Sequence, residues 1–318
     1  MLQGLISDID RFATHDGPGI RTAIFFQGCP LHCAWCHSPE TQPAQPVLLY
    51  RRTKCIECGK CIAVCPQGAI RRNLTQSLQE NPGGIKIDTT SCKTCFTCVD
   101  ACVSGALARS ACRKTCKEIT DILAQDKLFY HYSGGGVTLS GGEVLQQAAF
   151  ACEILEFCQC NQIHTAIETS GYGTPEQLFA VAKRANLIYY DIKLMNDDQH
   201  KHFVGAGNTL ILENLKMLSK NRTQVGQIVV RLPCIPAVND SPAQIEQTAK
   251  FVVGLGLPFM ELLPYNEAAA AKYAWVSRTY AMPPLHARSK AYYAKLQGVL
   301  DQLGLMSYET YCAKESRK

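Results

Sequence analysis

The chain has 318 residues, of which 47% are hydrophobic and 19% charged, and a mean hydropathy of −0.06, as expected for a globular protein with a sizeable core. No apolar run approaches the roughly 20 residues of a membrane span, and acidic residues ahead of residues 24–26 argue against a signal peptide. Its 18 cysteines therefore indicate a reducing compartment, the cytoplasm, and metal sites in place of disulfides.

The first predicted strand, residues 22–27, leads into a cysteine triplet. Cys29, Cys33 and Cys36 have the spacing C-x3-C-x2-C. Three thiolates on one short loop can hold three irons of a 4Fe–4S cluster and leave the fourth iron without a protein ligand. An open iron is what a cluster needs to bind and cleave S-adenosylmethionine (SAM), whereas a cluster closed by four cysteines can only carry electrons. The triplet therefore predicts a SAM-cleaving cluster.

Two further cysteine runs lie in an insert, residues 47–110, each with the spacing C-x2-C-x2-C-x3-C. They are Cys55, Cys58, Cys61 and Cys65, followed by Cys92, Cys95, Cys98 and Cys102. In two-cluster bacterial ferredoxins the fourth cysteine of each run ligates the other cluster. The predicted ligand sets are therefore Cys55, Cys58, Cys61 with Cys102, and Cys92, Cys95, Cys98 with Cys65. Two structural zinc sites are the alternative, although zinc motifs usually separate their cysteine pairs by longer gaps.

The insert also carries the whole formal excess of positive charge. Residues 47–110 contain nine Lys and Arg and four Asp and Glu, a difference of +5 that equals the net charge of the chain. Two 4Fe–4S clusters with their thiolates carry roughly −4 in total, and nearby basic residues offset that charge. We therefore expect no nucleic-acid partner.

Short apolar strands alternate with helical patterns along the rest of the chain. The predicted strands are residues 22–27, 137–140, 163–168, 187–191, 227–232 and 259–264. The predicted helices are residues 115–130, 144–158, 175–184, 210–219, 242–253 and 286–303. This alternation predicts an α/β fold with a parallel sheet and right-handed crossovers. The fold that fits is a partial (β/α)6 barrel, residues 1–46 and 111–318, with a ferredoxin-like two-cluster domain at 47–110.

Polar residues and glycines follow these strands at their carboxyl ends, where parallel α/β folds place their sites. They are Ser140-Gly141-Gly142-Glu143, Glu168-Thr169-Ser170-Gly171, Asp191-Ile192-Lys193, Arg231 and Pro264-Tyr265-Asn266. Each one alone is commonly a solvated loop residue, but together they predict one site at the mouth of the barrel. The glycines let backbone approach a ligand closely, and no phosphate-binding motif follows a strand.

These features together resemble the radical-SAM superfamily and, within it, the glycyl-radical-enzyme activases whose insert holds two clusters. The matching segments span nearly the whole chain and are residues 16–22, the triplet with Trp35, and residues 37–40, 140–143, 168–171, 191–193 and 261–265. The pyruvate formate-lyase type of activase lacks such an insert. The resemblance implies a radical-SAM oxidoreductase with three 4Fe–4S clusters.

The resemblance also implies roles for individual residues. Cys29, Cys33 and Cys36 would ligate the catalytic cluster, whose open iron SAM would chelate. The residues implied to bind SAM or line its pocket are Trp35, Gly141, Gly142, Glu143, Glu168, Thr169, Asp191, Lys193 and Arg231. Glu168, Thr169 and Asp191 match a monovalent-cation site of the pyruvate formate-lyase type, where an Asp stands in place of Glu168. Two more departures from the family pattern are Ser38 and Asn266, which replace an Asn and a His.

The implied reaction is SAM cleavage to a 5′-deoxyadenosyl radical, which takes a hydrogen from a glycine of a partner glycyl radical enzyme. Electrons would come from a donor such as flavodoxin or ferredoxin, and we expect no membrane partner. The insert clusters either relay these electrons or serve structure and docking. Two other readings stay open: a radical-SAM enzyme acting on a small molecule, peptide or nucleic acid, and an iron–sulfur electron-transfer protein.

Overall fold

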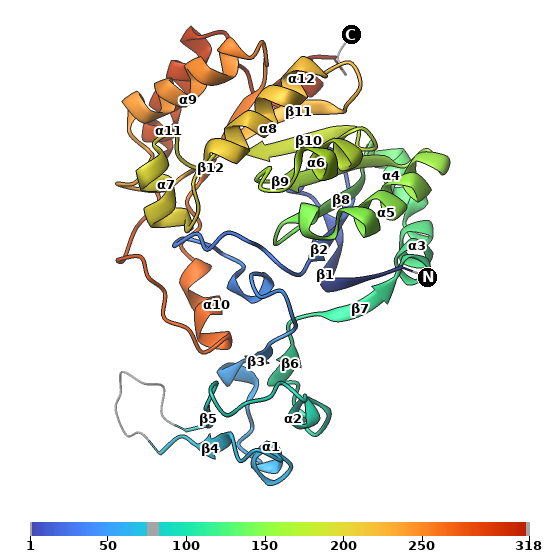
Figure 1. Cartoon of the computed structure of the whole chain (residues 1–318), viewed down its shortest axis with the longest axis vertical. Helices are drawn as coiled ribbons and strands as arrows, with labels where there is room; N and C mark the ends of the chain where they lie inside the picture. Colours follow the sequence, from blue (N-terminus) through green and yellow to red (C-terminus); the bar gives the residue numbers. More distant parts are fainter. Residues whose placement is uncertain (1, 75–82, 316–318) are drawn as a thin grey trace.

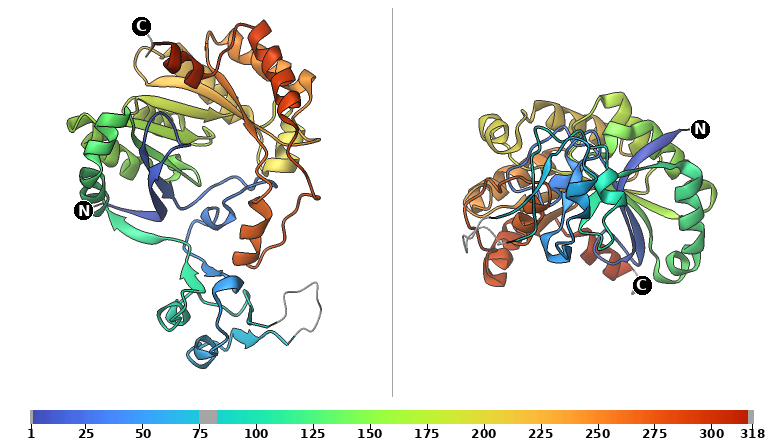
Figure 2. Two further views of the ribbon diagram at one scale, coloured as in Figure 1. Left: turned by 180° about the vertical axis from the view of Figure 1, so that it is seen from behind. Right: turned by 90° about the horizontal axis from the view of Figure 1, so that it is seen from below.

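Six parallel strands form the centre of the computed structural model, which describes residues 2–74 and 83–315. They are β2 Arg21–Phe26, β8 Gly136–Gly141, β9 His164–Thr169, β10 Leu187–Asp191, β11 Gln227–Cys234 and β12 Met260–Pro264. These strands lie side by side in this order, and every neighbouring pair is parallel. The sheet curves, with helices on its outer side (Figure 1; Figure 2). The predicted partial barrel is therefore confirmed.

Alternate residues of each strand serve the two faces of the sheet. Val137 and Leu139 of β8 are fully buried in the main core beneath the outer helices. Ala166 and Tyr189 belong to a second, smaller apolar cluster that contains neither of those residues. This period-2 pattern leaves Thr138 and the polar strand ends on the inner side, because successive side chains of a strand point to opposite faces.

Two antiparallel strands that the sequence analysis missed extend the sheet to eight strands. β1 Gln3–Ala13 pairs with β2, and β7 Cys112–Thr115 pairs with β1. β1 alternates between half-buried and exposed residues from Ser7 to Asp10. That alternation of burial is typical of a half-buried strand.

Most predicted helices are present with shifted ends. They correspond to α3 Cys116–Gln125, α4 Lys127–Ser133, η3 Val144–Gln147, α5 Ala148–Cys160, α6 Pro175–Ala182, α8 Thr209–Lys220, α9 Pro242–Gly254 and α11 Lys290–Gln302. Outside the insert, the helices of the described residues that were not predicted are η1 Pro39–Thr41, α7 Asp197–Val204, α10 Ala269–Trp275 and α12 Tyr308–Glu315. Thr115 and Thr174 start α3 and α6 with capping boxes, which satisfy free N–H groups of the first turn. Within the described residues, no helix is long and apolar enough to cross a bilayer.

The single helix predicted for residues 115–130 is wrong, because the chain breaks it at Asp126. The Asp126 side chain is 1% exposed, and its Oδ2 accepts hydrogen bonds from Arg11 Nε (2.9 Å) and Thr22 Oγ1 (3.0 Å). Both partners lie more than 100 residues away along the chain. A buried carboxylate needs such partners, so tertiary pairing overrides the helical pattern here.

The insert forms a small lobe beside the barrel (Figure 1; Figure 2). Its elements are β3 Leu48–Tyr50, η2 Arg52–Lys54, α1 Lys60–Ala63, β4 Ile70–Arg72, β5 Ile85–Ile87, α2 Thr97–Asp100 and β6 Leu107–Arg109. β3 pairs antiparallel with β6, so the entry and exit of the segment lie side by side. Its core consists of Cys61, Ile70, Ile85, Cys98 and Leu107. Helix α10 lies between the barrel and this lobe (Figure 1).

Candidate functional site

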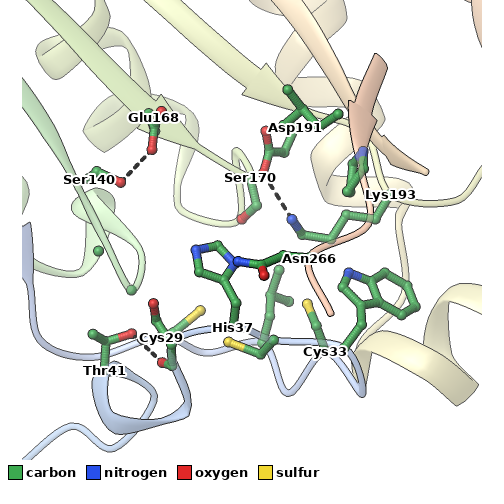
Figure 3. Close-up of a pocket in the computed structure, with 18 of the residues that line it drawn as sticks. Cys29, Cys33, His37, Thr41, Ser140, Glu168, Ser170, Asp191, Lys193 and Asn266 are labelled. Atoms are coloured by element: carbon green, nitrogen blue, oxygen red, sulfur yellow. Dashed lines mark hydrogen bonds and ion pairs between the residues drawn. The ribbon is translucent and has the colours of Figure 1, made fainter. Parts of the chain in front are cut away.

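A cavity of about 310 Å³ opens where the strands of the barrel end. The cysteine triplet lines one side, and the ends of β8, β9, β10 and β12 line the other (Figure 3). Of the predicted residues, the lining includes Cys29, Cys33, Cys36, Trp35, Gly141, Gly142, Glu168, Thr169, Asp191 and Lys193. Glu143 and Arg231 are not among the lining residues. Strand ends that are far apart in sequence therefore meet at one site.

Backbone hydrogen bonds to two other segments hold the loop that carries Cys29, Cys33 and Cys36, which we call the cysteine loop. Cys29 N donates to the carbonyl oxygen of Gln42 (3.0 Å), and His32 N donates to that of Val204 in α7 (2.8 Å). Burial raises the pKa of the Cys33 thiol to about 11. Such buried thiols lose their protons readily only when a nearby positive charge offsets the cost. Three thiols on one loop around a shared cavity fit three irons of a 4Fe–4S cluster.

Two glycines let the end of β8 pass close to this loop. Gly142 N donates to Phe26 O (2.9 Å), and Glu143 N donates to Gly28 O (2.9 Å). Gly141 has φ +109°, and a Cβ at either glycine would overlap the backbone of residues 25–28. Only glycine fits both positions, so backbone rather than side chains forms this wall of the cavity.

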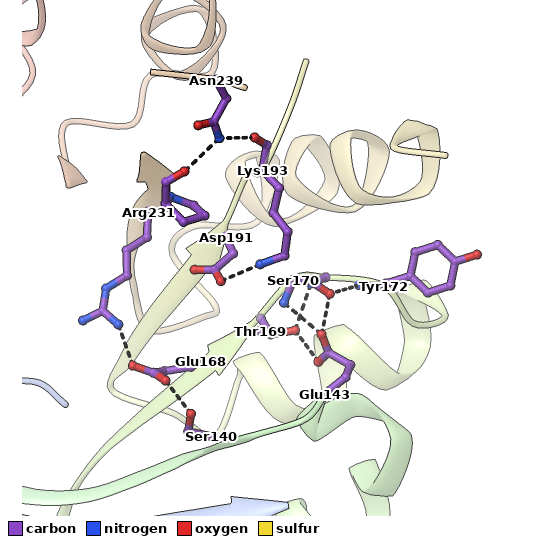
Figure 4. A network of polar contacts seen from close by, with 12 residues as sticks. Ser140, Glu143, Glu168, Thr169, Ser170, Tyr172, Asp191, Lys193, Arg231 and Asn239 are labelled. Atoms are coloured by element: carbon purple, nitrogen blue, oxygen red, sulfur yellow. Dashed lines mark hydrogen bonds and ion pairs between the residues drawn. The ribbon is translucent and has the colours of Figure 1, made fainter. Parts of the chain in front are cut away.

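Glu143 organises the end of β9 from behind the cavity (Figure 4). Its Oε2 accepts from Ser170 N (2.8 Å) and Ser170 Oγ (2.6 Å), while its Oε1 accepts from Thr169 Oγ1 (2.6 Å) and Leu145 N (3.2 Å). The residue is 1% exposed. Burial raises the pKa of Glu143, and the hydrogen bonds from Ser170 and Thr169 oppose that rise. The geometry makes Glu143 a positioning residue for residues 169–170.

Asp191 and Lys193 form an ion pair at the end of β10, with 3.0 Å between Lys193 Nζ and Asp191 Oδ2 (Figure 3). Burial alone would lower the pKa of Lys193, but Asp191 and the neighbouring Cys33 raise it overall, so the ammonium stays charged. Asn239 Nδ2 fixes the local backbone by donating to Lys193 O (2.7 Å; Figure 4). One fixed cation therefore faces the cavity beside the cysteine loop.

Arg231, in β11, is buried within a charged network and does not line the cavity. Its Nη1 donates to Glu168 Oε1 (2.5 Å) and its Nε to Glu261 Oε2 (3.3 Å), and the guanidinium lies over the ring of Tyr189. The other oxygen of Glu168 accepts a hydrogen bond from Ser140 (Figure 4). Both oxygens of this carboxylate are thus engaged by protein donors.

Several residues of the cavity wall were not predicted from the sequence. Asp16 lines it, and burial followed by the charge of Glu168 raises the pKa of Asp16. His37 also lines it, and burial followed by Lys272 lowers its pKa, which favours the neutral ring. Both belong to segments that were recognised as motifs, but their position at the cavity was not predicted. Tyr265 and Asn266, at the end of β12, lie at the cavity as expected.

Helix α10 braces the cysteine loop from the far end of the chain. Lys272 Nζ pairs with Glu40 Oε1 at 2.6 Å, and Arg278 Nη1, just beyond the helix, donates to Gln42 Oε1 at 2.7 Å. The ring of Trp275 lies under the guanidinium of Arg51 in the insert, 5.0 Å from its centre. No local pattern predicts this brace, because its partners are more than 200 residues apart.

The cysteines of the insert line two separate cavities. One is lined by Cys55, Cys58, Cys61 and Cys102, the other by Cys65, Cys92, Cys95 and Cys98. Each set takes its fourth cysteine from the other run, as in the predicted pairing. Leu107 N approaches Cys102 Sγ at 3.4 Å, a contact of the kind that tunes cluster thiolates. No group of three or more His, Cys, Asp or Glu in the described ranges is arranged to hold a single metal ion.

Comparison with known proteins gives consistent matches. Three family models match: the radical SAM superfamily at residues 113–252, a 4Fe-4S dicluster domain at 48–103 and a 4Fe-4S single cluster domain at 15–72. The chain is 38% identical to the trans-4-hydroxy-L-proline dehydratase activating enzyme of Clostridioides difficile, over 87% of this chain and 89% of that protein. It is 36% identical to the isethionate sulfite-lyase activating enzyme of Oleidesulfovibrio alaskensis, over 88% of this chain and 89% of that protein. It is 37% identical to the choline trimethylamine-lyase activating enzyme of the same organism, over 87% of this chain and 88% of that protein. The chain therefore belongs to the radical-SAM glycyl-radical-enzyme activating enzymes.

Proposed function

We propose that this chain activates a glycyl radical enzyme by cleaving SAM at a 4Fe–4S cluster held by Cys29, Cys33 and Cys36. When bound, the cluster and SAM supply a one-electron cleavage that gives methionine and a 5′-deoxyadenosyl radical, which takes a hydrogen atom from a glycine Cα of the partner. One observation carries the proposal: three thiols of one loop share a cavity of about 310 Å³ with the ends of the barrel strands. Family membership supports the same activity.

Within this cavity we assign residues to two tasks. Gly141 and Gly142 leave room for the methionine end of SAM, and the Asp191–Lys193 pair lines its pocket. Glu143 and Arg231 act behind the wall as positioning residues, since Glu143 binds residues 169–170 and Arg231 binds Glu168, while neither lines the cavity. We assign no monovalent cation to Glu168, because Ser140 and Arg231 already engage its two oxygens.

We further propose three clusters in two domains. One cluster belongs to the barrel, residues 1–46 and 111–318, and two belong to the insert, residues 47–110. The two cysteine-lined cavities of the insert support this count. The insert would relay electrons from a carrier such as flavodoxin or ferredoxin, and the many free cysteines fit a reducing cytoplasm.

Anaerobic electron paramagnetic resonance tests the proposed reaction. The reconstituted protein is mixed with SAM, dithionite and purified hydroxyproline dehydratase, isethionate lyase or choline lyase, the enzymes that the relatives are named for. A glycyl radical doublet with one of them, together with 5′-deoxyadenosine, supports the proposal and identifies the partner. Deoxyadenosine without any doublet across a panel of glycyl radical enzymes would move the target elsewhere. Neither product from protein with an intact cluster would refute the proposal.

The relay is tested by removing one ligand from each insert cluster. Cys58→Ser and Cys95→Ser should slow SAM cleavage driven by reduced ferredoxin much more than cleavage driven by dithionite, which reaches the barrel cluster directly. Equal losses with both reductants, in variants whose barrel cluster shows its normal spectrum, would favour a structural role for the insert.

A further inference from the structure

The two cysteine-lined cavities of the insert differ in what surrounds them. Beside the Cys55 set, Cys58 is exposed, Ile56 is 64% exposed, and Val103, the neighbour of Cys102, is 68% exposed. Large exposed apolar side chains of this kind are common at protein contacts. This side of the insert thus presents a cysteine of the proposed cluster beside the exposed apolar residue Ile56, with Val103 next to Cys102 in the chain.

Exposed basic residues lie on the same side of the insert. Lys60 and Arg72 line the cavity, and Lys54 lies just before Cys55; all three are exposed. Within the described residues, none of the three takes part in an ion pair. Glu57, the acidic residue of the lining, already accepts hydrogen bonds from Arg52 Nη2 (2.6 Å) and Gly84 N (3.0 Å). We call Lys54, Lys60 and Arg72 the basic rim.

The Cys92 side of the insert carries less unpaired positive charge. Its cavity is lined by one basic residue, Lys93, and by apolar groups that include Leu48, Ile70 and Phe96. Nearby, Arg109 pairs with Asp100 at 3.0 Å and lies over the ring of Phe96. An acidic surface would therefore meet more uncompensated positive charge at the basic rim than here.

We propose that the basic rim and Ile56 form the docking site of an acidic protein electron carrier, which delivers electrons first to the Cys55–Cys58–Cys61–Cys102 cluster. In this step the carrier loses one electron, the cluster gains it, and no covalent bond changes. The proposal rests on the relay proposed above. Transient redox complexes have small interfaces, and complementary charge steers their encounter. A rim of positive charge around an exposed apolar residue and a cluster cysteine meets these requirements.

The test measures binding directly. The probe is a purified acidic flavodoxin, titrated anaerobically against the cluster-loaded protein in the absence of SAM and partner enzyme. Lys60→Gln with Arg72→Gln should weaken binding about tenfold at low ionic strength. Lys86→Gln with Lys93→Gln is the matched control, because it removes the same charge from exposed lysines elsewhere on the insert, and it should change binding less than about twofold. The difference should shrink as salt screens the charges.

Equal weakening by both pairs would mean long-range attraction without a docking site and would overturn the proposal, as would unchanged binding in both. Lys60 lies between two cysteines, so the pair Lys54→Gln with Arg72→Gln repeats the test if iron content falls. The readout is separate from activity. A wild-type protein that binds flavodoxin at the rim but, with its barrel cluster intact, gives neither 5′-deoxyadenosine nor a glycyl radical with dithionite would refute the proposed function and leave the docking site standing.

Discussion

The hydrogen bonds of Glu143 lead to a quantitative prediction for Glu143→Gln. Each carboxylate oxygen accepts from one backbone N–H: Oε1 from Leu145 and Oε2 from Ser170. A glutamine amide has one oxygen and one NH₂ group, so in either orientation the NH₂ faces a backbone donor. The change leaves at least one buried N–H without an acceptor and brings two donors together.

A buried unsatisfied donor costs about 1–3 kcal/mol, and the loss of hydrogen bonds to a charged acceptor adds to it. We therefore expect Glu143→Gln to lower the free energy of unfolding by about 2–4 kcal/mol. Urea denaturation of the protein, followed anaerobically by far-ultraviolet circular dichroism, measures this change. SAM affinity should also fall, because residues 169–170 lose the group that positions them.

Glu156→Gln is the control, since this carboxylate is 53% exposed and pairs with Arg184 at the surface. Its loss should cost less than about 0.5 kcal/mol. The reasoning is refuted if Glu143→Gln and Glu156→Gln unfold at the same urea concentration. A smaller effect in Glu143→Gln than in its control would likewise show that the four hydrogen bonds do not carry the stability assigned to them.

Three further predictions follow from separate parts of the molecule. Trp275→Leu removes the ring beneath Arg51, worth about 0.5–1 kcal/mol, and should speed amide hydrogen exchange in β3, whereas Trp275→Phe keeps an aromatic face and should retain most of the protection. Burial, followed by the charge of Arg21, lowers the pKa of His164 in the folded protein to about 4, so the unfolded chain binds more protons than the folded protein between pH 6.5 and 4. The free energy of unfolding of the wild type should therefore fall relative to that of His164→Asn by at most about 2 kcal/mol at pH 5, and it should be unaffected above pH 7. Removing iron should increase hydrogen exchange in the insert far more than in β8 and β9, because the core of the insert is small and includes two cluster cysteines.

Each of these has an outcome that would contradict it. Equal amide hydrogen exchange in β3 of Trp275→Leu and Trp275→Phe would show that the contact between the ring and the guanidinium does not protect β3. Parallel pH profiles of the free energy of unfolding for wild type and His164→Asn would mean that His164 has the same pKa in the folded and unfolded states. Uniform loosening of barrel and insert after chelation would show that the insert does not depend on its metal more than the barrel does.

The sequence by itself determined the cluster motifs and the barrel. Three of the cysteines proposed for each cluster lie within a few residues of each other, so their spacing is a local property that a linear pattern records. Buried parallel strands also leave a local signal, and all six were predicted within two residues of their ends, with the largest difference at the carboxyl end of β11. The convergence of strand ends on one site followed from the parallel topology alone.

Only the tertiary structure decided what depends on distant partners. The break at Asp126 requires Arg11 and Thr22, and the brace of α10 on the cysteine loop joins Lys272 to Glu40. Glu143 looked like a ligand contact in its motif, but it is buried and bonded to the end of β9. A side chain takes its role from the donors and charges that packing brings to it, and these come from segments whose separation no local pattern records.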